Sequence, residues 1–340
     1  MRKAIWCAVT AMICALLPVA AAGALETRAH HVRATQHASV SKSGPESTTV
    51  VDGSMPTAPY AVGVTHVTYT DTSRPTEARG DVPASSSRTI AVTIRYPVMG
   101  VAGSSEVADT VADVGAYPLV VFAHGYDVSA ETYAAMEHQL AEAGFIVAAP
   151  DFPMTSSAIS GAADESDVSN QATDVSFVIT QLRDTTSVPA VLAGSIAPGP
   201  VGVVGHSDGG VTAAAVAYNS TVADPRIGAA VILSGAEARY DGTWFTTQSP
   251  ALLAIHGTAD EVNPIGSSEQ LYDDATGSKM LVTVQGGSHL GPFTTDAVEP
   301  TVAALVDDFL HAHLDGDAAA AARLPADSNV PGALDLAAAA

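Results

Sequence analysis

The sequence predicts an α/β fold: a mostly parallel, doubly wound sheet with helices on both faces and antiparallel N-terminal strands. Two observations predict it. Several short apolar runs lack polar alternation, which is typical of parallel strands buried on both faces. Segments with helical periodicity separate these runs, and strand and helix in alternation form right-handed βαβ units.

The expected elements follow one another in a regular order. Residues 60–70 and 89–97 alternate apolar and polar side chains, which predicts an antiparallel pair at the start of the domain. The apolar runs expected to form the later strands are residues 117–125, 145–152, 201–207, 228–235, 251–257 and 280–287. The expected helices are residues 130–144, 170–185, 210–219 and 300–314. In such sheets the ligand site lies at the carboxyl ends of the strands.

Residues 1–24 have the three parts of a secretory signal. Arg2 and Lys3 give a positive start, an apolar run follows, and small residues close the segment. The run is short for a bilayer span, so we expect cleavage, export to the extracellular space and no stable membrane anchor. Both cysteines, Cys7 and Cys14, lie in this segment, so the cleaved chain has no thiol and no disulfide.

Three further regions follow the signal. Residues 25–58 are polar without an apolar period and predict a flexible leader; residues 59–325 form the α/β domain; residues 326–340 form an alanine-rich C-terminal tail. The chain has 14 Lys+Arg against 36 Asp+Glu, a net charge of −22. Such a surface repels nucleic acid and anionic lipid. We therefore expect no nucleic-acid partner. We also expect no metal, because the sequence shows no cluster of ligands, and we expect a monomer.

The residues Gly205-His206-Ser207-Asp208-Gly209 match the pattern G-x-S-x-G. They follow a predicted strand and open a predicted helix, the context in which this pattern forms a sharp turn that exposes a nucleophilic serine. Glycines at both ends allow the backbone to approach its neighbours closely. The alternative is an ordinary strand-to-helix turn. A serine nucleophile also needs a base to accept its proton.

Two later strand ends supply candidate partners for Ser207. Asp260 follows the apolar run 251–257, and His289 follows the run 280–287. The order Ser, Asp, His is the one found where G-x-S-x-G carries the nucleophile. We predict Ser207 as nucleophile, His289 as base and Asp260 as the acid that orients it, although each residue alone would be an ordinary loop residue.

Other histidines compete for the role of the base. His206 adjoins the serine, but its side chain is expected to point away from the serine hydroxyl. His124 and His256 come at strand ends, where packing and hydrogen bonding explain them.

An oxyanion hole needs two backbone N–H donors. We predict the N–H of Asp208, directly after the nucleophile, and the N–H of Tyr126 in the loop after the strand at 117–125. The Tyr126 ring is also a candidate substrate-binding group beside the acyl pocket. The alternative for Tyr126 is an aromatic residue at the rim without a role.

These motifs together resemble the α/β-hydrolase superfamily. They are the loop AHGYD, FIVAAPDFP, the helix NQATDVSFVITQL, GHSDGG, IHGTADEVNP and GGSHLGPF, in that order over residues 60–325. More narrowly, the chain is similar to the secreted bacterial esterase branch, with polyester hydrolases of the cutinase type, dienelactone-hydrolase-like and platelet-activating-factor-acetylhydrolase-like esterases. The resemblance implies a secreted serine hydrolase that cleaves carboxylic esters through an acyl-enzyme without a cofactor. Its substrate would be a small-molecule, lipid or polymer ester.

The sequence also departs from that branch. Its polyester hydrolases usually carry Met where this chain has Asp208, and a Trp-His pair after the next strand that is absent here, although Tyr240 and Trp244 follow nearby. Asp208 has two explanations: it stabilises a helix N-terminus, or its carboxylate alters His289 and weakens the oxyanion hole. An acyltransferase with the same triad and a non-catalytic binding protein on this scaffold are the alternative functions.

Overall fold

The computed structural model describes residues 59–245 and 249–340. These residues belong to one compact unit, Gly53–Ala340. The predicted secretory signal at 1–24 and the predicted leader at 25–58 lie outside the described residues.

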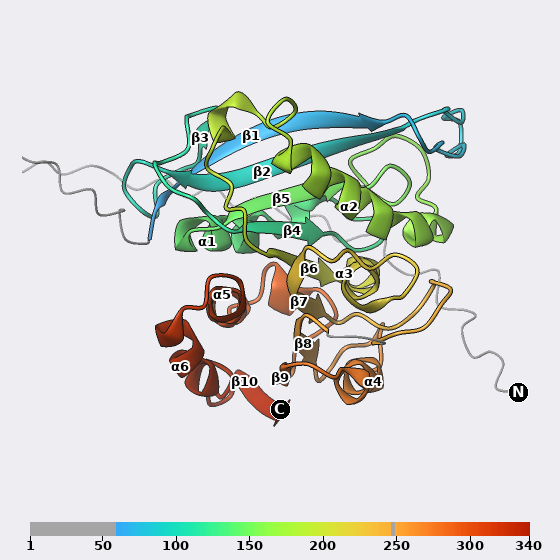
Figure 1. Ribbon diagram of the computed structural model, residues 1–340. Helices are drawn as coiled ribbons and strands as arrows, with labels where there is room; N and C mark the ends of the chain where they lie inside the picture. The colour runs from blue at the N-terminus through green and yellow to red at the C-terminus, as the bar shows by residue number, and fades with distance from the viewer. Residues whose placement is uncertain (1–58, 246–248) are drawn as a thin grey trace, which may run out of the picture. The chain divides into compact units, whose positions relative to one another are not determined.

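One sheet runs through the described part of the chain (Figure 1). Its strands are β1 (Ala61–Asp71), β2 (Arg88–Val98), β3 (Val107–Ala108), β4 (Leu119–Ala123), β5 (Ile146–Asp151), β6 (Val201–His206), β7 (Ile227–Leu233), β8 (Ala251–Gly257), β9 (Lys279–Val284) and β10 (Leu334–Ala339). Their order across the sheet is β10-β9-β8-β7-β6-β4-β5-β2-β1-β3. Strands far apart in the sequence therefore become neighbours, as β4 and β6 do.

The pairing confirms the predicted fold class. The strands from β4 to β9 run parallel to one another, and β1 pairs antiparallel with β2 along its full length, from Ala61 opposite Val98 to Asp71 opposite Arg88. Every residue of β4, β6 and β8 is buried. Burial on both faces explains why these strands read as unbroken apolar runs.

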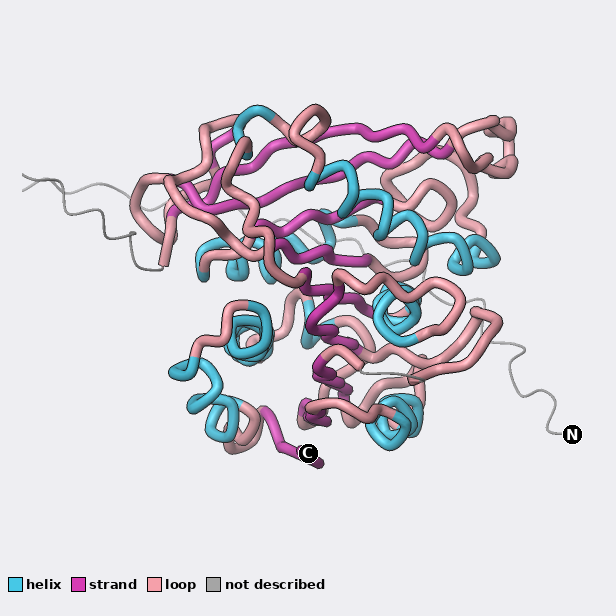
Figure 2. Tube along the Cα trace, viewed as in Figure 1, coloured by secondary structure: helices cyan, strands magenta, loops and turns pink. Residues whose placement is uncertain are grey.

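Helices cover both faces of this sheet (Figures 1 and 2). They are α1 (Ala134–Ala143), α2 (Val168–Arg183), α3 (Asp208–Tyr218), α4 (Gly266–Asp274), α5 (Glu299–Leu314) and α6 (Ala318–Asp327), with 3-10 turns η1 (Ala130–Tyr133), η2 (Glu165–Asp167), η3 (Ala190–Leu192) and η4 (Gly291–Phe293). Helices α1, α5 and α6 pack on one face, and α2, α3 and α4 pack on the other. No described helix is both long enough and apolar enough to span a membrane.

The C-terminal end differs from the expected tail at 326–340. Helix α5 stops near Gly316, which has φ +73, and a separate helix α6 begins where the Asp317 side chain accepts hydrogen bonds from two N–H groups. Strand β10 then pairs antiparallel with β9, with Leu334 opposite Val284. The domain boundary predicted at 325 is therefore too early, because residues 334–339 complete the edge of the sheet.

Candidate active site

Ser207 occupies a strained turn between β6 and α3. Its backbone has φ 56° and ψ −120°, a conformation that non-glycine residues rarely adopt. A Cβ placed on Gly205 would lie 2.1 Å from the carbonyl oxygen of Gly209, and one on Gly209 would lie 2.0 Å from that of Ala123. Only glycine fits at these two positions, as the G-x-S-x-G pattern predicted.

The structure brings together the three residues predicted as a triad. The Oγ atom of Ser207 lies 2.9 Å from Nε2 of His289, and Nδ1 of His289 lies 2.8 Å from Oδ2 of Asp260. They come from the carboxyl ends of β6, β8 and β9. The Ser207 hydroxyl is thus placed to donate its proton to an imidazole whose other nitrogen is held by a carboxylate.

Asp260 is held as a carboxylate by several donors. Its Oδ1 accepts hydrogen bonds from the N–H groups of Val262 and Asn263, both at 2.9 Å. Burial opposes the charged form, but hydrogen bonds from His256, His289 and these backbone groups outweigh it and hold the pKa of Asp260 well below its usual range. The side chain therefore stays negatively charged beside the candidate base. The neighbouring carboxylate of Glu261 is exposed.

His256 and Asn263 complete this acid loop, and the sequence had not assigned them to the site. His256 is fully buried, with Nδ1 2.8 Å from the Ser268 hydroxyl and Nε2 3.0 Å from the Asn263 carbonyl oxygen. The Asn263 amide donates to the carbonyl oxygen of Ser234, at the end of β7. The expectation that His256 serves hydrogen bonding at a strand end is correct, but its partners belong to the Asp260 loop.

The two predicted oxyanion donors flank the nucleophile. Asp208 is the first residue of α3, so its N–H is one of the four that have no partner within the helix. The loop that carries Tyr126 is close by, since a Cβ on Gly125 would lie 3.3 Å from Cβ of Ser207. The N–H of Tyr126 donates to no other residue in the described ranges. Both groups are thus available to a developing oxyanion.

His124 fixes the path of this loop. Its Nδ1 donates to the carbonyl oxygen of Gly125 at 2.7 Å, and its Nε2 accepts from the N–H of Phe152 at 3.0 Å. Burial lowers the pKa of His124. The ring is therefore a neutral structural group, in agreement with the role expected at this strand end.

Asp208 places a carboxylate next to the nucleophile. Its Oδ1 lies 3.9 Å from Nε of Arg239, while its Oδ2 is buried and has no hydrogen-bond partner among the described residues. Burial raises the pKa of Asp208 to about 6, against the lowering effect of Arg239. Glu165, which also contacts Arg239, raises it further. A helix N-terminus favours the charged form of a carboxyl group, so it does not explain the raised pKa of Asp208.

The loop at 153–169 borders the site beside Tyr126, because the Tyr126 hydroxyl donates to the carbonyl oxygen of Ala163 at 3.0 Å. Arg79, from the β1–β2 connection, is 3% exposed and holds this loop with its guanidinium group. It donates to the carbonyl oxygens of Ala162 at 3.0 Å, Pro153 at 3.1 Å and Ser156 at 2.6 Å. One arginine side chain thus holds the loop at 153–169 in place beside Tyr126.

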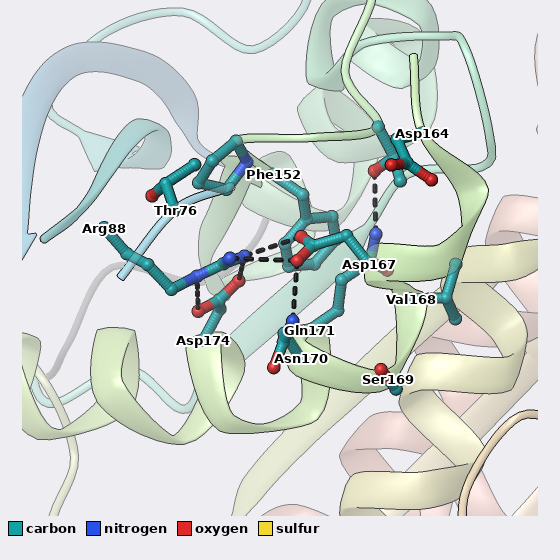
Figure 3. A network of polar contacts seen from close by, with 12 residues as sticks. Thr76, Arg88, Phe152, Asp164, Asp167, Val168, Ser169, Asn170, Gln171 and Asp174 are labelled. Carbon is teal, nitrogen blue, oxygen red and sulfur yellow. Dashed lines mark hydrogen bonds and ion pairs between the residues drawn. The ribbon is translucent and has the colours of Figure 1, made fainter. Parts of the chain in front are cut away.

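A second arginine holds the end of this loop, where it leads into α2 (Figure 3). Arg88 of β2 is 1% exposed and lies between the carboxylates of Asp167 and Asp174, at the start of α2. It donates to both oxygens of Asp167, at 3.0 and 2.8 Å, and to both oxygens of Asp174, at 2.9 and 2.6 Å. Such bidentate pairs fix geometry as well as charge.

The aromatic residues noted after β7 do not replace the missing Trp-His pair. The Tyr240 hydroxyl accepts a hydrogen bond from the N–H of Ala172, in the first half of α2, at 3.1 Å. Trp244 forms a bridge with Asn219, beyond the last residue of α3. Helix α3 begins directly after Ser207 and its 11 residues span about 16 Å, so Trp244 lies far from the nucleophile.

The described residues offer no set of ligands for a metal ion. No three His, Cys, Asp or Glu side chains there gather in a way that could hold a metal ion. The site instead consists of a hydroxyl, an imidazole, a carboxylate and two free N–H groups, which are the parts of nucleophilic acyl transfer.

Comparisons with known proteins agree with this reading of the fold. The family model described as Chlorophyllase matches residues 101–237, which include Tyr126, Ser207 and Asp208 but neither Asp260 nor His289. A ferulic acid esterase from Streptomyces cinnamoneus has a similar structure, with a TM-score of 0.64 and 20% sequence identity, over 84% of this chain and 98% of that one. No curated protein has a matching sequence. The chain therefore has the α/β-hydrolase fold, and residues 101–237 are similar to the Chlorophyllase family.

Proposed function

We propose that this protein is a serine hydrolase that cleaves carboxylic esters through a Ser207–His289–Asp260 triad. The observation that carries the proposal is the pair of contacts at His289, 2.9 Å to the Ser207 hydroxyl and 2.8 Å to the Asp260 carboxylate. The strained backbone of Ser207 supports it, because strain of this kind clusters at functional sites.

The chemistry follows from the positions of these groups. Ser207 Oγ attacks the ester carbonyl while His289 Nε2 takes its proton, and the N–H groups of Tyr126 and Asp208 hold the oxyanion. The tetrahedral intermediate collapses, the C–O bond to the alcohol breaks, and His289 returns the proton to the leaving oxygen. Water then adds to the acyl-enzyme by the same route and releases the acid. Asp260 orients the imidazole and stabilises its charged form throughout.

The substrate we propose is an uncharged ester. The nucleophile is flanked by the carboxylate of Asp208, with Glu165 nearby and Arg239 between them, so an anionic acyl group would meet repulsion from the two carboxylates. The half-exposed ring of Tyr126 offers an apolar surface beside the scissile carbonyl. Lipid-like esters fit this description, and polyesters are a further candidate class.

We also propose that the protein is exported. The support is the sequence of residues 1–24, with its basic start, apolar run and small-residue end. Mass spectrometry of the N-terminus after secretion from an expression host would measure the cleavage site. An intact N-terminus retained in the cell would contradict export.

Hydrolysis of p-nitrophenyl esters from acetyl to palmitoyl tests the catalytic proposal. We expect activity in the wild type and a loss of at least about 10³-fold in Ser207→Ala. Ser234→Ala is the matched control, because Ser234 also has a positive φ at a strand end and its hydroxyl has no hydrogen-bond partner among the described residues. An inactive wild type, or equal activity in Ser207→Ala, would overturn the proposal. Ester product formed with an added alcohol would favour the acyltransferase instead.

A further inference from the structure

His206 lies at the centre of a hydrogen-bond chain that joins three loops of the site. Its Nε2 lies 2.7 Å from the backbone carbonyl oxygen of His289, and its Nδ1 lies 2.7 Å from the hydroxyl of Tyr133. That hydroxyl in turn accepts a hydrogen bond from the N–H of Gly125 at 3.3 Å. One side chain on the elbow therefore reaches both the loop of the base and the loop of the oxyanion donor.

The direction of each hydrogen bond in this chain is determined by chemistry. A carbonyl oxygen only accepts, so Nε2 of His206 carries the proton that bonds His289. The Gly125 N–H only donates, so the Tyr133 hydroxyl accepts it and gives its own proton to Nδ1 of His206. Burial, with the nearby His289, lowers the pKa of His206 to about 3, which keeps the ring neutral as this arrangement requires.

Packing holds the chain rigidly in place. His206 is 2% exposed and Tyr133 is fully buried. The His206 ring lies 4.7 Å from the His289 ring and 5.2 Å from the Phe293 ring, between centroids. No water is needed to satisfy the polar atoms of either side chain, so displacing either partner leaves a buried group unpaired.

We propose that His206 is a positioning residue for catalysis, which aligns the His289 base and the Gly125–Tyr126 oxyanion loop with Ser207. The proposal rests on the proposed function of this site. His206 does not take the proton of Ser207: both of its ring nitrogens are engaged elsewhere, and Nε2 of His289 faces the hydroxyl. Its contribution is to hold two separately folded loops at the distances that the reaction requires.

The hydrogen-bond chain has two branches: the base branch runs from His206 to the carbonyl oxygen of His289, and the oxyanion branch runs from His206 through Tyr133 to Gly125. Three substitutions separate these two branches. His206→Gln keeps a donor near the Nε2 position and loses the acceptor for Tyr133, whereas His206→Asn keeps an acceptor near Nδ1 and loses the reach to His289. Tyr133→Phe removes the hydroxyl and with it both contacts of the oxyanion branch. Tyr218→Phe is the matched control, because that tyrosine is also buried and its hydroxyl donates to the backbone carbonyl of Ala251, which is not part of the hydrogen-bond chain through His206.

We expect each of the three variants to lower kcat for p-nitrophenyl butyrate by about 10- to 100-fold with KM changed less than about threefold. The Tyr133→Phe/His206→Gln double variant should be no worse than Tyr133→Phe alone, because both cut one branch. Tyr133→Phe/His206→Asn should be worse than either single variant, because it cuts both branches. Thermal unfolding is measured in parallel, and Tyr218→Phe should lose stability without losing kcat.

Unchanged kcat in the folded Tyr133→Phe variant would overturn the proposal, since that substitution removes the hydroxyl that joins Gly125 to His206. So would a loss of kcat that merely follows the loss of folded protein, as judged by the Tyr218→Phe control. Labelling of Ser207 by a fluorophosphonate distinguishes failure of this proposal from failure of the proposed function. The rate of labelling is measured for each variant, with the wild type as reference. A wild type that is neither labelled at Ser207 nor active would refute the proposed function itself.

Discussion

The Nε2 atom of His256 lies 3.3 Å from Oδ2 of Asp260, the same oxygen that contacts Nδ1 of His289. One carboxylate oxygen thus contacts two imidazole rings. The ring of His256 is buried, and the ring of His289 faces the nucleophile. The Nε2–H of His256 is shared between this oxygen and the Asn263 carbonyl. The arrangement fixes the orientation of Asp260 from the side that substrate does not reach.

Replacing His256 by Leu is expected to lower kcat by about tenfold. One hydrogen bond to the Asp260 carboxylate is lost, and a bond to a charged group is worth about 1.5–3 kcal/mol. Ser268→Ala is the control, because it removes the partner of Nδ1 and leaves the contact with Asp260. Steady-state kinetics of both variants checks the prediction, and equal rates in the two variants would contradict it.

Asp260→Asn is expected to lower kcat by about 10⁴-fold, as loss of the charged partner of a catalytic histidine does in a serine protease. It also changes the dependence of stability on pH. The pKa of Asp260 is lowered in the folded state, so its charge stabilises the fold above the unfolded pKa of about 3.9, and this contribution is lost as the pH falls below it.

Denaturant unfolding of wild type and Asp260→Asn between pH 3 and pH 8 measures this effect. The difference in unfolding free energy should be constant above about pH 5 and should shrink in more acidic solution. A difference that stays the same down to pH 3 would show that the Asp260 carboxylate is not stabilised in the fold.

Asp208→Asn is expected to raise kcat/KM above pH 6 relative to wild type. The pKa of Asp208 is about 6, so the wild type gains a negative charge beside the oxyanion site as the pH rises through this value. That charge opposes the oxyanion of the transition state. The ratio of kcat/KM between variant and wild type should therefore rise from pH 5 to pH 8.

A stability measurement checks the same titration. Here the unfolding free energy should change with pH in the direction opposite to that expected for Asp260. The pKa of Asp208 is raised in the folded state, so the wild type loses stability as the pH rises from about 4 to 6, and Asp208→Asn does not. Asp81→Asn, at an exposed position, is the control. If the kinetic ratio is flat while the stability effect is present, Asp208 titrates but its charge does not act on the oxyanion.

Arg79→Leu is expected to lower the unfolding free energy by about 3 kcal/mol, because three carbonyl oxygens lose their donor, two of them in buried hydrogen bonds. Arg79→Lys should recover little, since one ammonium group does not reach three separated acceptors. Arg323→Leu is the control: its ion pair with Asp308 is exposed on the arginine side, and such a pair contributes about 1 kcal/mol or less. Equal losses in the two Leu variants would contradict a specific role of Arg79.

Loosening the loop that Arg79 holds also affects the site. Ala163, in this loop, accepts the Tyr126 hydroxyl, so we expect a higher KM in Arg79→Leu with a smaller change in kcat. Limited proteolysis should cut Arg79→Leu faster than wild type within residues 153–169. Resistance equal to that of wild type would show that other contacts hold the loop.

Parts of the fold escaped prediction for identifiable reasons. Helix α4 buries only Ser268 and Leu271, so it has no apolar period that a pattern could reveal. Strand β10 is built from LDLAAA, whose alanines hide the alternation, and only its pairing with β9 defines it as a strand. Short amphipathic signals of this kind are decided by packing rather than by propensity.

The amino-acid sequence by itself determined the α/β order of the elements and the positions of Ser207, Asp260 and His289 at strand ends. These features are local: apolar runs mark buried strands, and glycines mark a turn where no side chain fits. Tertiary structure alone decided which buried polar groups serve the site. The chain from Gly125 through Tyr133 and His206 to His289 joins residues far apart in the sequence, and hydrogen bonds of this kind depend on orientations that only the folded packing creates.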